Sequence, residues 1–183
     1  MIIANKKKQE NIAEYVLYMY QIEDLVRAFG FDLDKLEQNV FGSFTENESL
    51  KKEIREWYGN IIQMMELEQL KEKGHLQIVK NVVNDLDDLH RNLLNNPAET
   101  EYQNKYHLAA PNIAELAGKM KMENPNDVEV MFQGLYAVML LRLQKREITP
   151  DTQKAVDTFS NLLALLSKKY HQREEKERTE WMG

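Results

Sequence analysis

The sequence contains no cysteine. Disulfide bonds, thiolate zinc sites, iron–sulfur clusters and cysteine nucleophiles are therefore excluded. A chain without disulfides fits a reducing compartment. The three lysines at residues 6–8 are followed by polar residues, whereas a secretory signal places an apolar stretch after its basic residues. We therefore expect a cytoplasmic protein.

Glycine and proline are also scarce, with seven and four among 183 residues. β-Sandwiches and barrels need frequent turns, so this scarcity argues against them. Hydrophobic residues make up 43% of the chain and charged residues 30%, a balance typical of a folded globular protein. The longest apolar run, Gly134 to Leu141, is much shorter than a membrane span, and we expect no membrane association.

Positive charge is in deficit, with a net charge of −6. Residues 30–103 hold eight Lys and Arg against fifteen Asp and Glu, and this stretch accounts for the acidic excess. An acidic surface repels phosphate backbones, and no basic cluster is interleaved with aromatic residues. We expect no nucleic-acid partner. Residues 1–8 are predicted to form a solvated N-terminal arm.

Helix-capping signals divide the chain. A capping residue precedes a proline at the first helical position at three places, Asn96-Pro97, Asn124-Pro125 and Thr149-Pro150. Thr45 and Glu48 have the spacing of a capping box. Three glycines stand where helix C-terminal glycines are found, namely Gly30, Gly42 and Gly74.

The periodicity of apolar residues agrees with these signals. It predicts helices over about 12–29, 32–40, 46–73, 75–95, 97–121, 126–147 and from 150 onward. Pro111 should break or kink the fifth of these. The segment 126–147 is apolar on nearly every side, so we expect it to be a central, almost fully buried helix. Residues 172–183 are highly charged and should form a frayed tail. The sequence thus predicts one all-α domain over residues 1–183, a helical bundle of about six or seven helices.

Metal-binding and catalytic patterns are incomplete. Di-metal bundles use paired Glu-x-x-His motifs. This chain offers Asp87 with His90, and Glu72 with His75, where Gly74 should end the helix. His90 lies on an apolar stripe, which is typical of a hydrogen-bonded core histidine. Nucleophile-elbow and phosphate-binding glycine motifs are missing. We therefore assign no catalytic residue, no metal and no cofactor, and favour a protein that is not an enzyme.

Arg142 is the most informative polar residue because it interrupts an apolar run. A buried guanidinium needs a partner, so we expect either a carboxylate beside it or a head that reaches solvent. The partner candidates are Glu23, Asp24, Asp85 and Asp87. A structural ion pair explains such a contact; the alternative is an anion-binding pocket. The candidate binding cluster comprises Glu23, Asp24, Asp87, His90 and Arg142.

Aromatic residues and mid-helix glycines raise two further expectations. Tyr15, Tyr18 and Tyr20 cannot all face one core, so at least one should be exposed or line a groove. Gly59 and Gly134 fall inside predicted helices, where glycine costs about 1 kcal/mol relative to alanine. Close approach of a neighbouring helix is the favoured reason for each; room for a ligand is the alternative.

Three stretches together resemble a known family. They are residues 11–15 continuing to 20–25 (NIAEY, YQIEDL), residues 71–77 (KEKGHLQ) and residues 141–145 (LRLQK). With them the chain resembles, over nearly its whole length, an uncharacterised bacterial family of small proteins filed as a domain of unknown function. The resemblance implies a bacterial cytoplasmic protein of one domain and supplies no catalytic residue, cofactor or partner.

Two hypotheses about function remain. The leading one is a non-enzymatic interaction or scaffolding protein, with a protein partner or self-association, such as a homodimer formed through an apolar helix face. The alternative is a small-molecule- or metal-binding helical bundle built on the candidate cluster, with hydrolysis as one action open to it. The first requires an exposed apolar patch or a symmetric interface, and the second requires polar side chains around a cavity.

Overall fold

The computed structural model describes residues 2–122 and 126–181, and these ranges contain helices and no strand. The predicted all-α, single-domain fold is confirmed. The described part holds no helix that is both long and apolar enough to cross a membrane. In chain order the elements are α1 (Ile2–Glu10), α2 (Ile12–Ala28), α3 (Leu33–Leu36), the π-helix η1 (Glu37–Phe41), α4 (Glu48–Leu67), α5 (Gln77–Asn95), α6 (Thr100–Met120), α7 (Asp127–Leu143) and α8 (Pro150–Trp181).

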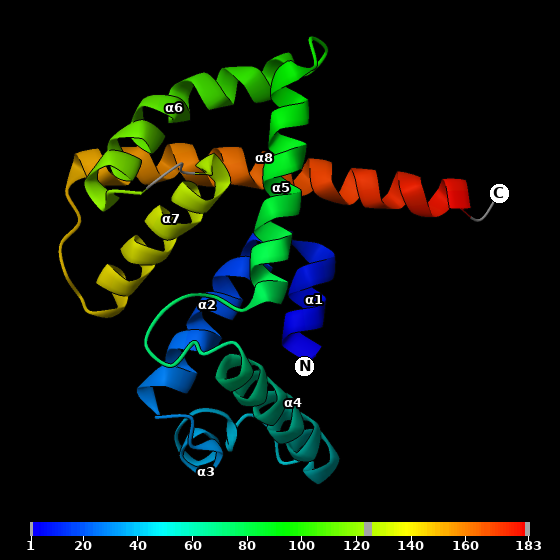
Figure 1. Ribbon diagram of the computed structural model, residues 1–183, viewed down its shortest axis with the longest axis vertical. Helices are drawn as coiled ribbons and strands as arrows, with labels where there is room; N and C mark the ends of the chain where they lie inside the picture. Colours follow the sequence, from blue (N-terminus) through cyan, green and yellow to red (C-terminus); the bar gives the residue numbers. More distant parts are fainter. Residues whose placement is uncertain (1, 123–125, 182–183) are drawn as a thin grey trace. The chain divides into compact units, whose positions relative to one another are not determined.

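This domain consists of two compact units. The first consists of residues 2–10 and 14–81, and the second of residues 11–13 with the described residues from 82 onward. Helix α5 begins in the first unit and continues in the second. Figure 1 follows the elements by colour along the chain.

The core of the first unit is formed by the predicted apolar face of α2 and by residues of the elements up to the start of α5. Its buried side chains include Val16, Met19, Ile22, Val26, Leu36, Phe41, Tyr58, Ile61, Met65, Leu70 and Leu76. Helix α2 ends at Ala28 and is followed by Gly30, whose φ of +65° suits glycine; the amide of Phe31 donates to the Val26 carbonyl at 2.9 Å. Arg55 of α4 pairs with Asp34 at 2.5 Å and with Glu37, which fastens α4 to the two short helices.

Helix α4 is shorter than the predicted range and starts at a different cap. The Asn47 side chain accepts a hydrogen bond from the Leu50 amide at 3.1 Å, so Asn47, not Thr45, is the N-cap. The Thr45 hydroxyl accepts instead from the Asn47 amide, which makes it part of the preceding turn. At the other end, Gln69 adopts a φ of +58° and the Leu70 amide donates to the Met65 carbonyl, which closes the helix early.

Helices α6, α7 and α8 pack against one another pairwise in the second unit. Large buried side chains fill the space among them and beneath α5, including Leu86, Tyr102, Ile113, Val128, Met131, Phe132, Phe159, Leu162 and Leu166. The last turns of α8 extend past the other helices of this unit (Figure 1), in agreement with their exposed side chains.

Two prolines of the second unit behave differently from the prediction. Pro97 lies in a turn, and α6 starts only at Thr100, because the Asn96 side chain accepts from the Ala98 amide and caps a turn instead of a helix. Pro111 lies inside α6, which remains one continuous helix and changes direction along its length (Figure 1). Pro111 removes the donor to the carbonyl of His107, and both residues are exposed, so water can satisfy that carbonyl.

Helix α7 is buried only in part. Its N-cap is Asn126, which accepts from the Glu129 amide at 3.0 Å; the predicted cap at Asn124-Pro125 lies outside the described residues. Most side chains from Val128 to Val138 are buried. The helix ends at Leu143, which is 67% exposed, and the expected burial along 126–147 is therefore limited to its first three turns.

The two ends of the described chain are helical. Helix α8 starts at Pro150 behind Thr149, whose hydroxyl accepts from the Thr152 amide, as predicted. It continues to Trp181 through the charged segment, where Arg173 with Glu177 and Lys176 with Glu180 form pairs at 3.8 Å. Residues 2–8, which were expected to form an N-terminal arm, belong to α1.

Candidate functional site

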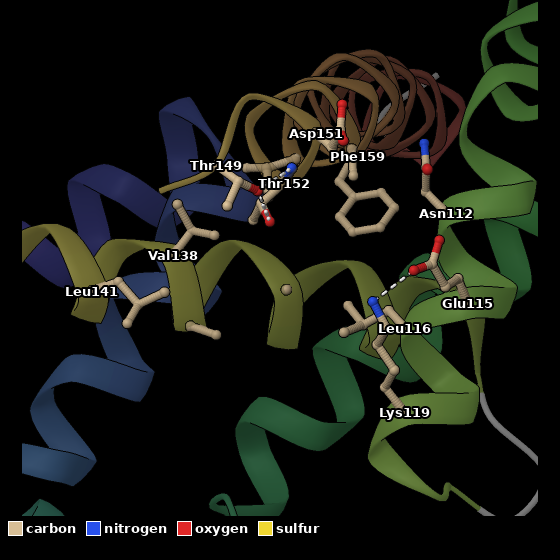
Figure 2. A pocket seen from close by; sticks show the side chains of 14 residues that line it. Asn112, Glu115, Leu116, Lys119, Val138, Leu141, Thr149, Asp151, Thr152 and Phe159 are labelled. Atoms are coloured by element: carbon tan, nitrogen blue, oxygen red, sulfur yellow. Dashed lines mark hydrogen bonds and ion pairs between the residues drawn. The ribbon is translucent and has the colours of Figure 1, made fainter. Parts of the chain in front are cut away.

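The second unit contains a groove between α6, α7 and the first turns of α8, with a volume of about 500 Å³. We call it the α6–α8 groove. Figure 2 shows its labelled side chains directed around a common space. It is lined by Asn112, Glu115, Leu116, Lys119, Gly134, Ala137, Val138, Leu141, Thr149, Asp151, Thr152, Ala155, Val156 and Phe159.

The floor of the groove follows from helical spacing. Residues three, four and seven positions apart share one face of a helix. On α7 this spacing aligns Gly134, Val138 and Leu141, and on α8 it aligns Thr152, Val156 and Phe159. Small residues, namely Gly134, Ala137 and Ala155, occur along these faces. The floor of the groove is therefore largely apolar, and the polar lining residues lie around it.

Gly134 has a packing role at this floor. A Cβ atom at this position would lie 2.8 Å from Cδ2 of Leu116 and 2.9 Å from Cε2 of Phe159. Those distances are too short for real contacts, so glycine is needed for α6 and α8 to approach α7 this closely. The favoured explanation for a mid-helix glycine, close helix approach, is confirmed at Gly134.

Polar residues line the rim. Lys119 and Glu115 of α6 form an ion pair at 2.6 Å, visible in Figure 2, and Lys119 lowers the pKa of Glu115. Asn112 donates to the Thr158 hydroxyl at 3.2 Å, across to α8. Asp151 stands almost fully exposed in the first turn of α8.

Arg142 lies next to the groove, one residue beyond Leu141. It is exposed, and its Nη2 donates to Oε1 of Gln153 at 2.8 Å. None of the predicted carboxylates is its partner. The guanidinium reaches solvent, so it needs no buried carboxylate as a counter-charge.

Glu23 and Asp24, two other residues of the predicted cluster, lie on α2 in the first unit. Glu23 is fully buried; Oε2 lies 2.6 Å from Nδ1 of His75, and Oε1 accepts from the Leu76 amide at 2.9 Å. The His75 ring stacks on Tyr20 with centroids 3.7 Å apart. Asp24 pairs with Arg27 at 2.8 Å, and Arg27 also donates to the carbonyls of Leu70 and Gly74. These contacts hold the loop between α4 and α5 against α2.

Asp87 and His90 lie on α5 in the second unit, and both are buried. Asp87 pairs with Arg91, not with His90. His90 Nδ1 lies 2.6 Å from the Tyr102 hydroxyl, as expected of a hydrogen-bonded core histidine. Its Nε2 lies 3.7 Å from Oδ2 of Asp127 and has no hydrogen-bond partner among the residues that the structure describes.

Asp127, which is half-buried, completes this group. It accepts a hydrogen bond from the Tyr106 hydroxyl at 2.9 Å. The His90 imidazole, and then the Tyr106 hydroxyl, hold the pKa of Asp127 below its usual value. Burial and the adjacent Asp127 raise the pKa of Tyr106 to about 12. Within the described residues, no set of three His, Asp or Glu side chains is arranged to hold a metal ion.

The structure thus gives each predicted site residue a partner of its own. Glu23 and Asp24 contact elements of the first unit, Asp87 and His90 contact different side chains of the second, and Arg142 contacts Gln153. Sequence reasoning missed Asp127 and His75 as members of buried polar groups. His75 was visible only as half of a broken Glu-x-x-His motif.

The three tyrosines of α2 do not all face the core, but none of them is fully exposed. Tyr15 and Tyr20 are buried, whereas Tyr18 is half-buried and stacks on Trp57 with centroids 6.5 Å apart. Burial raises the pKa of Tyr18. Tyr18 and Trp57 form a partly exposed aromatic pair in the first unit.

Comparison with known families agrees with the resemblance drawn from the sequence. The family model described as Domain of unknown function (DUF4924) matches residues 1–177, and the chain belongs to that family. No curated protein and no solved structure matches the chain.

Proposed function

We propose that this protein acts by binding, as a non-enzymatic helical interaction protein, and that the α6–α8 groove is its binding surface. The observation that carries the proposal is the groove itself: apolar side chains of α7 and α8, together with Leu116 of α6, line a common space of about 500 Å³ that the described residues leave unfilled. Apolar surface in contact with water is unfavourable, so a partner that covered it would gain free energy.

The dimensions of the groove suit an amphipathic helix. From Gly134 to Leu141 it runs for about 10 Å along α7, the length of two helical turns. Two turns present apolar side chains at positions i, i+3 or i+4 and i+7, which is the pattern by which helices bind in grooves. Polar groups at the rim, such as Glu115 and Lys119, would fix the partner's orientation.

The state of the titratable residues supports binding over catalysis. A general acid or base must reach a substrate atom, either directly or through one water molecule. Glu23 and Asp87 are instead buried in ion pairs or hydrogen bonds with neighbouring residues. Arg142 is exposed beside the groove and is suited to contact a partner.

The test is photo-crosslinking in the organism that makes the protein. A benzophenone amino acid at Ala137, which is exposed within the groove, should yield a discrete crosslinked species. Ala155→Trp, which fills the groove, should abolish that species. Ala164→Trp, on the exposed side of α8, is the matched control and should leave it unchanged. A crosslink that persists in Ala155→Trp, or none at all, would contradict the proposal.

Small-molecule binding is the second candidate, and the volume of the groove favours it. Ligand pockets commonly have volumes of roughly 300–1,000 Å³, and the groove falls in this range. Native mass spectrometry of tag-free protein purified without chelator would detect a stoichiometric adduct. Loss of that adduct in Ala155→Trp, but not in Ala164→Trp, would place a small molecule in the groove.

We further propose that the protein acts in a bacterial cytoplasm. The cysteine-free sequence and the stretches at residues 11–25 and 71–77 support this location. Fractionation of cells that make the protein at its native level tests the proposal. Recovery with the periplasmic or membrane fraction would contradict it.

A further inference from the structure

Nε2 of His90 is a buried polar atom that lacks a hydrogen bond among the described residues. The side chain is 2% exposed, and Nε2 lies 3.7 Å from Oδ2 of Asp127, which is too long for a hydrogen bond. The other ring nitrogen, Nδ1, lies 2.6 Å from the Tyr102 hydroxyl. Buried polar atoms are nearly always paired, so a nitrogen that faces a carboxylate across such a gap calls for a physical reason.

Tyr102 determines which nitrogen of an uncharged ring carries the hydrogen. Tyr102 is fully buried, and within the described part of the chain Nδ1 of His90 is the hydrogen-bond partner of its hydroxyl. A buried hydroxyl hydrogen needs an acceptor. An uncharged imidazole has one donor and one acceptor nitrogen, so Tyr102 donates to Nδ1 and the ring hydrogen is on Nε2. That hydrogen is directed toward Asp127.

The charge on Asp127 agrees with this arrangement. His90, and then the Tyr106 hydroxyl, hold the pKa of Asp127 below its usual value, so its carboxylate is charged at neutral pH. The Tyr106 hydroxyl donates to the same oxygen, Oδ2, at 2.9 Å. An N–H group opposite this oxygen is attracted to it, whereas a bare nitrogen lone pair would be repelled.

A proton added to His90 would change both contacts of the ring. The charged imidazole carries hydrogen on both nitrogens, so Nδ1 would donate to the Tyr102 oxygen. The Tyr102 hydrogen would then have to turn away from the ring, into a buried place without an acceptor. At the same time the positive charge would draw Asp127 from 3.7 Å to the roughly 2.7–2.9 Å of a charged hydrogen bond. Proton uptake therefore weakens the contact of α5 with α6 and strengthens its contact with α7.

The other titratable groups near the ring do not perform this role. Asp87 and Arg91 of α5 form an ion pair with each other, and Lys169 of α8 pairs with Glu99 at the start of α6. The pKa of Tyr106 is raised to about 12, and burial also raises the pKa of Tyr102, so both hydroxyls keep their hydrogens at neutral pH. This leaves His90 as the group whose charge can change opposite a charged Asp127.

We propose that His90 is a proton-operated switch in the second unit, which accepts a hydrogen bond from Tyr102 of α6 when uncharged and pairs with Asp127 of α7 when protonated. Histidine is the side chain that ordinarily changes charge near neutral pH, so such a switch suits a response to the acidity of the surroundings. The switch is separate from the α6–α8 groove and does not depend on the proposed function.

Nuclear magnetic resonance of the full chain, labelled with nitrogen-15, tests the switch over a pH series. The shifts of the two ring nitrogens distinguish the two uncharged forms and the charged form. At pH 8 the His90 hydrogen is expected on Nε2, with Nδ1 bare. As the pH falls, both nitrogens should become protonated, and the Asp127 and Val128 amides should shift in step with the ring. A ring with its hydrogen on Nδ1 at pH 8, a ring already charged there, or one that stays uncharged until the chain unfolds overturns the inference.

Variants of Asp127 test the second position of the switch. Asp127→Asn removes the charge that attracts the protonated ring, so the pH at which His90 takes up its proton should fall by about one pH unit or more. Asp127→Glu retains a carboxylate and should keep proton uptake closer to that of the parent. Asp151→Asn, at an exposed position in the first turn of α8, is the matched control and should change nothing at His90.

Circular dichroism checks that each variant keeps its helix content. If Asp127→Asn does not fold, the comparison of Asp127→Glu with the parent and the titration of the parent itself still decide the outcome. Proton uptake by His90 at the same pH in the parent and in a folded Asp127→Asn overturns the inference, and so do α7 amides that do not follow the ring.

Discussion

Oε2 of Glu23 lies 2.6 Å from Nδ1 of His75, and Glu23 is fully buried. Its other carboxylate oxygen accepts from the Leu76 amide, so a single side chain of α2 satisfies two donors of the segment that leads into α5. A buried carboxylate is costly unless it is paired in this way. The contact joins residues 52 positions apart and fixes the α4–α5 loop within the first unit.

Removing this carboxylate should therefore destabilise the protein strongly. Glu23→Ala leaves the Leu76 amide and His75 without their acceptor in a buried place, and we expect a loss of about 2–4 kcal/mol in the free energy of unfolding. Urea denaturation measures it. Glu53→Ala, at an exposed position of α4, is the control and should cost less than about 0.5 kcal/mol. If Glu23→Ala also lowered the free energy of unfolding by less than about 0.5 kcal/mol, the contact would add little to stability.

Gly134 and Gly118 make a matched pair of helical glycines. Alanine is the better helix former by about 1 kcal/mol at both positions. Gly134→Ala nevertheless forces a methyl group against Leu116 and Phe159, and should destabilise by about 1–3 kcal/mol. Gly118→Ala meets open space and should stabilise by up to about 1 kcal/mol. Urea denaturation at a fixed low protein concentration measures both changes. The same sign for both substitutions would show that close packing does not decide the outcome at Gly134.

The sequence predicted those parts of the fold that depend on residues close together in the chain. The cap at Thr149 and the end of α2 at Gly30 were predictable because a few consecutive residues determine each one. Asn47 displaced Thr45 as a cap because the Thr45 hydroxyl accepts from the Asn47 amide in the preceding turn, while the Asn47 side chain accepts from the Leu50 amide of the helix. Pro111 stayed within a helix because the carbonyl that it leaves unpaired is exposed, and exposure depends on tertiary structure.

The groove could not be predicted because its walls come from three helices. The sequence marked Gly134 as a place of close approach but gave no register between α6, α7 and α8, so the unfilled space stayed hidden. Arg142 was misleading for a related reason: its neighbours Leu141 and Leu143 are apolar, yet the last turn of α7 is exposed. The contact of Asp127 with His90 could not be predicted either, because it joins separate helices.

Asp127 should make stability depend on pH in the acid range. Its folded pKa lies below the ordinary value of 3.8, because His90 and Tyr106 stabilise the charged form. The contribution is therefore fully present above the unfolded pKa and is lost as the pH falls through the folded pKa. Asp127→Asn should lower the free energy of unfolding by about 1–3 kcal/mol at neutral pH.

The difference in the free energy of unfolding between the parent protein and Asp127→Asn should shrink as the pH falls below 3.8. Urea denaturation at a series of pH values measures it, and the comparison cancels carboxylates that titrate alike in both proteins. Glu48→Gln, in the exposed first turn of α4, is the control and should show little change with pH. A difference that stayed constant down to the acid limit would contradict a lowered pKa for Asp127.

Tyr102 and His90 should behave as a coupled pair. Tyr102→Phe leaves His90 Nδ1 buried without its partner, and should cost about 1–3 kcal/mol. His90→Leu in the Tyr102→Phe background removes the orphaned nitrogen, so part of that loss should be recovered. A double-mutant cycle by urea denaturation yields the coupling energy. Additive effects would show that the 2.6 Å contact contributes nothing beyond the packing of the two rings.

The charged end of α8 should contribute little to the stability of the fold. Residues 174–180 are exposed, and their ion pairs span 3.8 Å across one helical turn, a geometry worth only a few tenths of a kcal/mol per pair. Ending the chain after Arg173 should therefore change the free energy of unfolding by less than about 0.5 kcal/mol. Ending it after Asn161 is the opposite control, because it removes the buried Leu162, Leu163 and Leu166 and should prevent folding. A loss above about 1 kcal/mol in the shorter truncation would show that these turns pack against the rest of the chain or against a second copy.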